Sequence, residues 1–207
     1  MKTAPSHPTL IVLAAISLAL AACGKDPVDG IASTPKQSAT AVVEDIPTAA
    51  SPLAMAAIRG DLVEIKALLD AGAEVNVTDA LGRTPLHMAA FYGRTKASEA
   101  LLAQGATVNA RDRVGMTPLH AAVLAGGRYE VEFLLDRKAD FNATTDSGQT
   151  PLHLAAATGQ PRVSRILIER GADPTSKDED AKTPLAYAIR NKHPATAELL
   201  QQYAAKE

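Results

Sequence analysis

Three histidines and one cysteine are the side chains with the clearest capacity for chemistry in this chain of 207 residues. His87, His120 and His153 lie 33 residues apart, and Cys23 is the only cysteine. Such spacing places the histidines on equivalent helices of a repeated unit, about 8–10 Å apart, whereas a shared zinc ion needs each nitrogen at about 2.0–2.1 Å. We therefore expect no shared metal ion. A lone thiol also excludes a disulfide within the chain.

The other polar side chains form no pattern typical of catalysis. The sequence has no Gly-x-Ser-x-Gly elbow, no His-Glu-x-x-His motif and no phosphate-cradling glycine loop. The acidic run Asp178-Glu179-Asp180 could bind Ca²⁺, but it lacks the alternating ligands and turn glycine of a calcium loop, which favours a solvated loop tip. With 21 Lys and Arg against 23 Asp and Glu, nothing attracts the chain generally to phosphate backbones. We expect no enzyme activity, no cofactor and no nucleic-acid partner.

The amino-terminal segment predicts export. Residues 10–22 form an apolar run of 13 residues after Lys2, which as a helix would reach only about 20 Å and is typical of a signal peptide. Leu20-Ala21-Ala22-Cys23 resembles the lipobox of bacterial lipoproteins, which implies cleavage after residue 22 and a lipid on Cys23. By the same resemblance, Gly24 in place of Asp implies the outer membrane, with the protein in the periplasm. The alternative is an ordinary cleaved signal that leaves Cys23 an incidental thiol.

Residues 23–50 are expected to hold the lipidated cysteine and a flexible tether. Pro27, Pro35 and Pro47 lie among Ser, Thr, Ala and Asp without helical or strand periodicity. A flexible chain of this length spans about 30 Å on average. The folded part would then stand clear of the lipid surface.

One motif repeats at constant spacing through the rest of the chain. Its copies begin 33 residues apart: Ser51-Pro52-Leu53-Ala54, Thr84-Pro85-Leu86-His87, Thr117-Pro118-Leu119-His120, Thr150-Pro151-Leu152-His153 and Thr183-Pro184-Leu185-Ala186. The pattern resembles the ankyrin repeat, which implies an all-α solenoid of helix-turn-helix units with hairpin fingers, about five repeats including the caps. The expected units are 51–83, 84–116, 117–149, 150–182 and 183–207, within one domain from 51 to 207.

The local chemistry of each unit agrees with this fold. Thr or Ser before Pro supplies an N-cap and a proline at the first helical position, where a missing N–H costs nothing. Four glycines are expected to end the first helices with a positive φ: Gly60, Gly93, Gly126 and Gly159. Three positions lack a glycine that the pattern calls for: Lys138, Ala181 and Lys192. In ankyrin repeats the histidine of the motif makes structural hydrogen bonds, and the resemblance implies that role for His87, His120 and His153.

The same resemblance implies a protein-binding surface. In ankyrin domains partners generally lie against the concave face, formed by the finger tips and the exposed ends of the first helices. Carried over by position, the surface comprises Leu81, Arg83, Phe91, Tyr92, Arg113, Val114, Met116, Leu124, Asp146 and Gln149. Phe91 and Tyr92 are adjacent aromatic residues, the type favoured at binding hot spots, and Leu81, Val114 and Met116 would add an apolar patch. Alternatively, Phe91 packs back on its own unit and the apolar tips are scattered.

These patterns predict a monomeric interaction module in the cell envelope that binds a periplasmic or exported protein and meets the membrane only through its lipid. It could act as an inhibitor or immunity protein for an exported toxin or hydrolase. It could instead be a scaffold for a periplasmic stress-defence enzyme such as catalase. A ligand-binding or hydrolytic role would require a closed pocket of convergent polar groups.

Overall fold

The computed structural model describes residues 50–205, which belong to one compact unit. The predicted signal peptide, Cys23 and the tether lie outside the described residues. Within residues 50–205 the chain forms five helix pairs and no strand. The pairs are α2 (Pro52–Arg59) with α3 (Leu62–Asp70), α4 (Pro85–Phe91) with α5 (Thr95–Ala103), α6 (Pro118–Ala125) with α7 (Arg128–Asp136), α8 (Pro151–Ala157) with α9 (Pro161–Glu169), and α10 (Pro184–Arg190) with α11 (Pro194–Ala204). None of these helices has the length and apolar character to cross a membrane.

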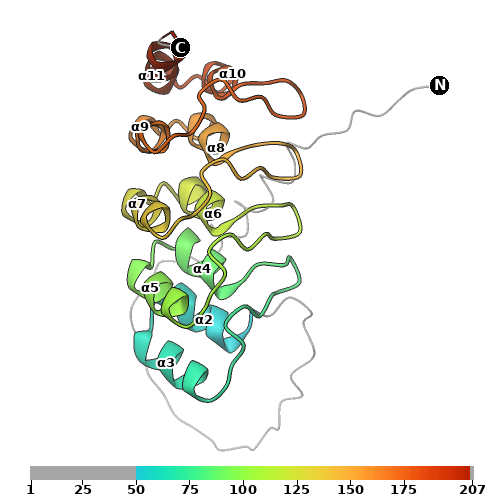
Figure 1. Ribbon diagram of the computed structural model, residues 1–207, viewed down its shortest axis with the longest axis vertical. Helices are drawn as coiled ribbons and strands as arrows, with labels where there is room; N and C mark the ends of the chain where they lie inside the picture. Colours follow the sequence, from blue (N-terminus) through green and yellow to red (C-terminus); the bar gives the residue numbers. More distant parts are fainter. Residues whose placement is uncertain (1–49, 206–207) are drawn as a thin grey trace, which may run out of the picture. The chain divides into compact units, whose positions relative to one another are not determined.

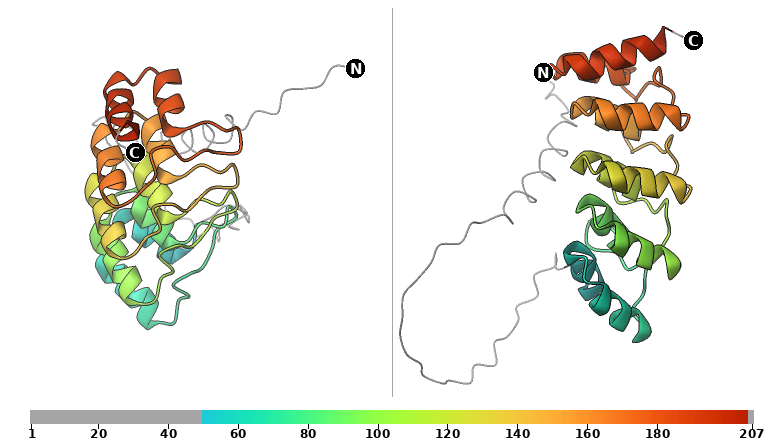
Figure 2. Two further views of the ribbon diagram at one scale, coloured as in Figure 1. Left: turned by 45° about the horizontal axis from the view of Figure 1, so that its top comes forward. Right: turned by 90° about the vertical axis from the view of Figure 1, so that its left-hand side faces the viewer.

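The helix pairs stack one on the next. The first helices (α2, α4, α6, α8, α10) form one layer and the second helices (α3, α5, α7, α9, α11) form another, while the loops between pairs project as fingers beside the first layer (Figures 1 and 2). Each helix contacts its counterpart in the next pair. The expected all-α solenoid is therefore confirmed.

Each first helix begins where the Thr-Pro or Ser-Pro pair predicts. Proline opens α2, α4, α6, α8 and α10, and the preceding Thr or Ser is the N-cap. At α4 the Thr84 hydroxyl accepts a hydrogen bond from the His87 backbone N–H, and the His87 ring returns a contact to the Thr84 backbone. This reciprocal capping satisfies donors that a helix start leaves free.

Left-handed residues lie at helix ends and in the finger turns as expected, even where glycine is absent. Gly60 and Gly126 cap α2 and α6 with φ of 72°. The three positions that lack glycine also adopt positive φ: 69° at Lys138, 58° at Ala181 and 61° at Lys192. A side chain costs about 1–2 kcal/mol in this conformation. The surrounding repeat therefore imposes the conformation against a local preference.

The core consists of leucine and alanine at fixed register. The motif leucines of the first four units are at most 1% exposed, and alanines such as Ala56 and Ala57 in α2 and Ala89 and Ala90 in α4 are fully buried. Small side chains let neighbouring first helices pack closely, and this packing fixes the spacing of the fingers.

Candidate protein-binding surface

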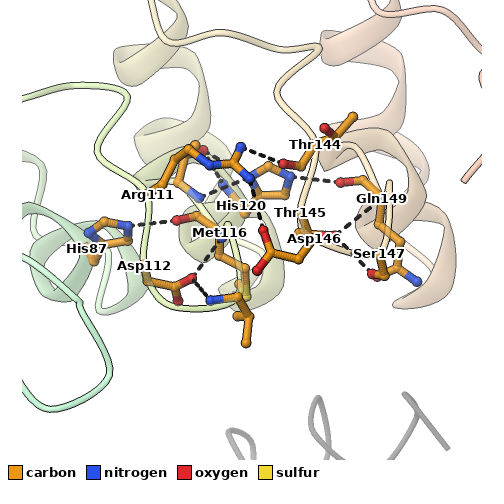
Figure 3. A network of polar contacts seen from close by, with 12 residues as sticks. His87, Arg111, Asp112, Met116, His120, Thr144, Thr145, Asp146, Ser147 and Gln149 are labelled. Carbon is orange, nitrogen blue, oxygen red and sulfur yellow. Dashed lines mark hydrogen bonds and ion pairs between the residues drawn. The ribbon is translucent and has the colours of Figure 1, made fainter. Parts of the chain in front are cut away.

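The three motif histidines tie the bases of the second, third and fourth fingers to the helix layer. In unit 84–116 the Thr84 backbone N–H donates to Nδ1 of His87 at 3.1 Å, and Nε2 lies 3.0 Å from the Met116 carbonyl. His120 repeats both contacts, with Nε2 3.2 Å from the Gln149 carbonyl (Figure 3). His153 does the same, with Nε2 3.1 Å from the Lys182 carbonyl.

These contacts fix the chemical state of the rings. Because Nδ1 accepts a backbone N–H, the proton of the neutral ring lies on Nε2, which donates to the carbonyl. Burial lowers the pKa of all three histidines, and it lowers the pKa of His120 to about 4. Both nitrogens of each ring are occupied, so neither is available to a metal ion. Among residues 50–205 no group of three or more His, Cys, Asp or Glu side chains could hold a metal ion.

The finger tips are joined by a ladder of backbone hydrogen bonds. The Arg113 N–H donates to the Leu81 carbonyl at 2.9 Å, and the Asp146 N–H donates to the Val114 carbonyl at 3.0 Å. The Glu179 N–H continues the ladder to the Ser147 carbonyl at 3.2 Å. The second, third and fourth fingers are held both at the base and at the tip, and the ladder joins the first finger to the second. The side chains on the tips therefore have a fixed relative placement.

Within the first finger, Asp79 and Arg83 stabilise the turn. The Asp79 carboxylate accepts the backbone N–H groups of Leu81 and Arg83, and it forms an ion pair of 2.7 Å with the Arg83 guanidinium. Burial acts to raise the pKa of Asp79, but the hydrogen bonds and charge of Arg83 outweigh it and lower the pKa below its usual value. Arg83 is therefore engaged in the turn.

Three predicted surface residues are exposed on adjacent tips. Leu81 is 50% exposed and Val114 is 39% exposed. Arg113, between them along the ladder, is exposed and makes no ion pair among the described residues. We call Leu81, Arg113 and Val114 the finger-tip surface. It combines two aliphatic side chains with one free positive charge.

The other predicted residues are less available. Phe91, Met116 and Leu124 are half-buried and pack against the core. Phe91 also meets Tyr92 edge to face, with ring centroids 5.3 Å apart, and leaves Tyr92 36% exposed at the end of α4. Phe91 is therefore partly taken up by the core, while Tyr92 remains more exposed.

Two polar contacts near the fingers have no signal in the sequence motif. Arg111 donates to the Thr144 carbonyl at 2.7 Å and pairs with Asp146 at 3.2 Å, bridging the second and third fingers (Figure 3). Asp146, a predicted surface residue, is exposed but paired in this way.

Gln149, another predicted surface residue, is also engaged. Its amide donates to the Tyr187 hydroxyl at 2.7 Å, and that hydroxyl donates to the Asp178 carboxylate at 2.6 Å. Burial, aided by Asp178, raises the pKa of Tyr187 to about 12, so the donor stays protonated. The sequence gives one indication of this contact. Tyr187, which has a hydroxyl, occupies the repeat position that Met88, Ala121 and Leu154 hold in the earlier units.

Away from the fingers, the second layer contains a buried carboxyl group. Glu130 on α7 is 1% exposed, its Oε1 accepts the Ser98 hydroxyl at 2.5 Å, and its Oε2 has no partner. Burial raises the pKa of Glu130. An open hollow of about 510 Å³ lies nearby at the starts of α7 and α9, lined in part by Tyr129 and Arg162. It includes none of the predicted surface residues.

Stacked helix-turn-helix units joined by a finger ladder define the chain as a repeat solenoid, a class that presents an extended surface instead of a closed pocket. A family model for ankyrin repeats (3 copies) matches residues 38–112, 109–178 and 131–207. The chain belongs to the ankyrin-repeat family. No curated protein matches it. Ankyrin repeats generally mediate protein–protein interaction, and the family is typically a non-enzymatic interaction domain.

Proposed function

We propose that this protein is an exported, envelope-anchored module that captures a periplasmic or exported protein on its finger-tip surface. The main support is the exposure of Leu81 and Val114 on neighbouring tips that a backbone hydrogen bond joins. The equivalent residues of the next two fingers are Ser147 and Asp180. Since polar residues are accepted at this register, two exposed aliphatic side chains on neighbouring tips are better explained by a partner than by folding.

Location is the second element of the proposal. The signal-like run before residue 23 and the lipobox resemblance support a lipid on Cys23 and retention at the outer membrane, facing the periplasm. Metabolic labelling with a fatty acid tests this directly. We expect label on the wild type and none on Cys23→Ser. An unlabelled wild type, or label retained by Cys23→Ser, would refute the anchor.

The binding surface is tested by a double substitution with a matched control. Leu81→Ser with Val114→Ser should weaken binding to the partner by about 2 kcal/mol, roughly thirtyfold in Kd. The control is Val63→Ser, because Val63 is 82% exposed on α3 in the other helix layer. Kd is measured by calorimetry with a partner identified from membranes, after urea unfolding shows that each variant is folded. An unchanged Kd in the double variant would contradict the proposal.

The identity of the captured protein distinguishes the two roles. An exported toxin or hydrolase that loses activity on binding would make the protein an inhibitor or immunity protein. A catalase or other oxidoreductase that stays active while bound would make it a scaffold. Activity of the purified partner with and without the module measures the difference.

A further inference from the structure

Charge is segregated in this solenoid although the total is close to neutral. A short loop joins the two helices of each pair, whereas a finger joins one pair to the next, so loops and fingers lie at opposite ends of the helices. The fingers carry nine Asp or Glu and five Lys or Arg, in residues 74–83, 107–116, 140–149 and 173–182. We call the other end the loop edge, which comprises residues 59–63, 92–96, 125–129, 158–162 and 191–195. The loop edge carries six Lys or Arg and one Asp.

Most of the cations on the loop edge lack a close acidic partner. Three are exposed and form no ion pair with another residue between 50 and 205: Lys96, Arg162 and Lys192. Arg128 has only the Glu132 carboxylate, at 3.9 Å, whereas Arg59 is paired closely with Glu64. The protein itself therefore leaves much of this positive charge without a counterion.

The second residue of each second helix adds apolar side chains to the same edge. In chain order these residues are Val63, Lys96, Tyr129, Arg162 and Ala195, and all five are exposed. They form a row because the units stack in register. Val63 is 82% exposed and Tyr129 is 73% exposed, so packing within the solenoid does not explain them. A row that combines aliphatic, aromatic and basic side chains is typical of surfaces that lie on a lipid bilayer.

Hydrogen bonds between neighbouring loops hold much of this row in place. Nε of Arg94 donates to a carbonyl of α2 at 2.9 Å, which links the second loop to the first. The Gln160 amide donates to a carbonyl of α6 at 2.8 Å, and the Asn191 amide donates to a carbonyl of α8 at 2.7 Å. The spacing of the charges along the loop edge is therefore set before any partner binds.

The hollow at the starts of α7 and α9 opens on this edge. Its volume is about 510 Å³, and Arg128, Tyr129 and Arg162 line part of it. The Arg128 guanidinium lies over the Tyr129 ring, 4.7 Å from its centroid. Guanidinium groups donate paired hydrogen bonds to phosphate oxygens, and tyrosine is favoured at the level of lipid headgroups. The hollow therefore suits the phosphate of a lipid headgroup.

We propose that the loop edge docks on an anionic phospholipid surface, with a lipid phosphate in the hollow between α7 and α9. The contact rests on the proposed envelope location, and it names the face of the solenoid that meets the membrane there. A bilayer fits better than an acidic protein segment, because every one of the five loops carries a Lys or Arg and the row runs the whole length of the solenoid. The solenoid itself then meets the membrane in addition to the predicted lipid, and the fingers stay accessible to a protein.

Single tryptophans test the contact in the full chain with Cys23→Ser, which lacks the predicted lipid and has no tryptophan of its own. Tyr129→Trp reports on the loop edge, and Leu81→Trp reports on a finger tip. In phosphatidylglycerol vesicles brominated near the headgroup end of the acyl chains, we expect quenching about fivefold stronger at position 129 than at position 81. Both chains contain the predicted signal segment, so any lipid affinity of that segment acts equally on the two.

Two results would overturn the proposal. One is equal quenching at the two positions in phosphatidylglycerol, which would favour an acidic protein as the partner of the edge. The other is a preference for position 129 that persists in brominated phosphatidylcholine, which carries no net charge. Fatty-acid labelling of Cys23 and partner binding at the fingers do not enter this assay, so the contact and the proposed function can fail separately.

Charge reversal with a matched control identifies the residues. In the Tyr129→Trp chain, Arg128→Glu with Arg162→Glu should lower the quenching about fivefold or more. Lys138→Glu with Lys177→Glu makes the same change in net charge at two exposed positions off the loop edge and should leave the quenching unchanged. Circular dichroism confirms that both variants are folded. An equal loss in the two variants, or no loss in either, would overturn the proposal.

Discussion

Acid should weaken the solenoid through its buried histidines, and His120 allows the effect to be calculated. Desolvation lowers its pKa from the usual 6.5 to about 4. A proton on Nδ1 would face the Thr117 N–H, which now donates to that atom. Because the unfolded chain binds this proton more readily, the stabilisation is complete above pH 6.5 and is lost as the pH falls toward 4.

The magnitude follows from these two pKa values. Between pH 7.5 and pH 5.0, His120 alone should lower the free energy of unfolding by about 2 kcal/mol. Burial lowers the pKa of His87 and His153 as well, so they act in the same direction. Glu130 acts in the opposite direction, since a raised pKa gives stability that is present at low pH and lost as the pH rises.

Comparison of the wild type with a His120 variant separates the contribution of His120 from those of the other titrating groups. Urea unfolding followed by circular dichroism gives the free energy of unfolding of the wild type and of His120→Gln at both pH values. Glutamine can still donate to the Gln149 carbonyl but does not titrate. We expect the wild type to lose about 2 kcal/mol more than the variant on acidification. Equal losses in the two proteins would refute the assignment of this pH dependence to His120.

Three further substitutions test other parts of the structure. Lys138→Gly should raise stability by about 1 kcal/mol, because it removes a side chain from a left-handed residue, and a thermal melt with no gain would contradict this. Glu130→Gln should raise the free energy of unfolding at pH 7.5 by about 1 kcal/mol, since the amide avoids burying a charge and can still accept the Ser98 hydroxyl; the gain should vanish in acid urea titrations. Tyr187→Phe should cost about 1–3 kcal/mol, because Asp178 loses a hydrogen bond in a buried site, and an unchanged urea midpoint would argue against that network.

Most of the fold could be predicted from the sequence because its determinants are local and repeated. A Thr-Pro pair supplies the cap and the first helical residue within two positions, and a left-handed residue ends the element a turn or two later. The repeat imposes the left-handed conformation even on residues that disfavour it, as at Lys138 with φ of 69° and Ala181 with φ of 58°. Each such site is a small local cost that stacking offsets.

The candidate surface is harder to predict, because the repeat register places a residue in the fold but does not determine which side chains it contacts. The register places both Phe91 and Leu81 on the surface, yet Phe91 packs against the core and Leu81 is half exposed. The register places Gln149 on the surface as well, but its amide donates a hydrogen bond to the Tyr187 hydroxyl, 38 residues away. Whether a side chain at such a position is exposed or engaged depends on the side chain that the neighbouring unit places beside it. The pattern of a single repeat does not specify that contact.

The way the fingers are held bears on how they would bind. Neutral histidines fix the bases of the second, third and fourth fingers, as at His87 and the Met116 carbonyl. The ladder links the tips of all four fingers, as between Arg113 and Leu81. Association is weakened by the cost of ordering loops at an interface, about 0.5–1.5 kcal/mol for each mobile side chain that is immobilised. Fingers that are held in place before binding avoid much of this cost. This favours the proposed binding of a partner on a small surface with two exposed aliphatic residues.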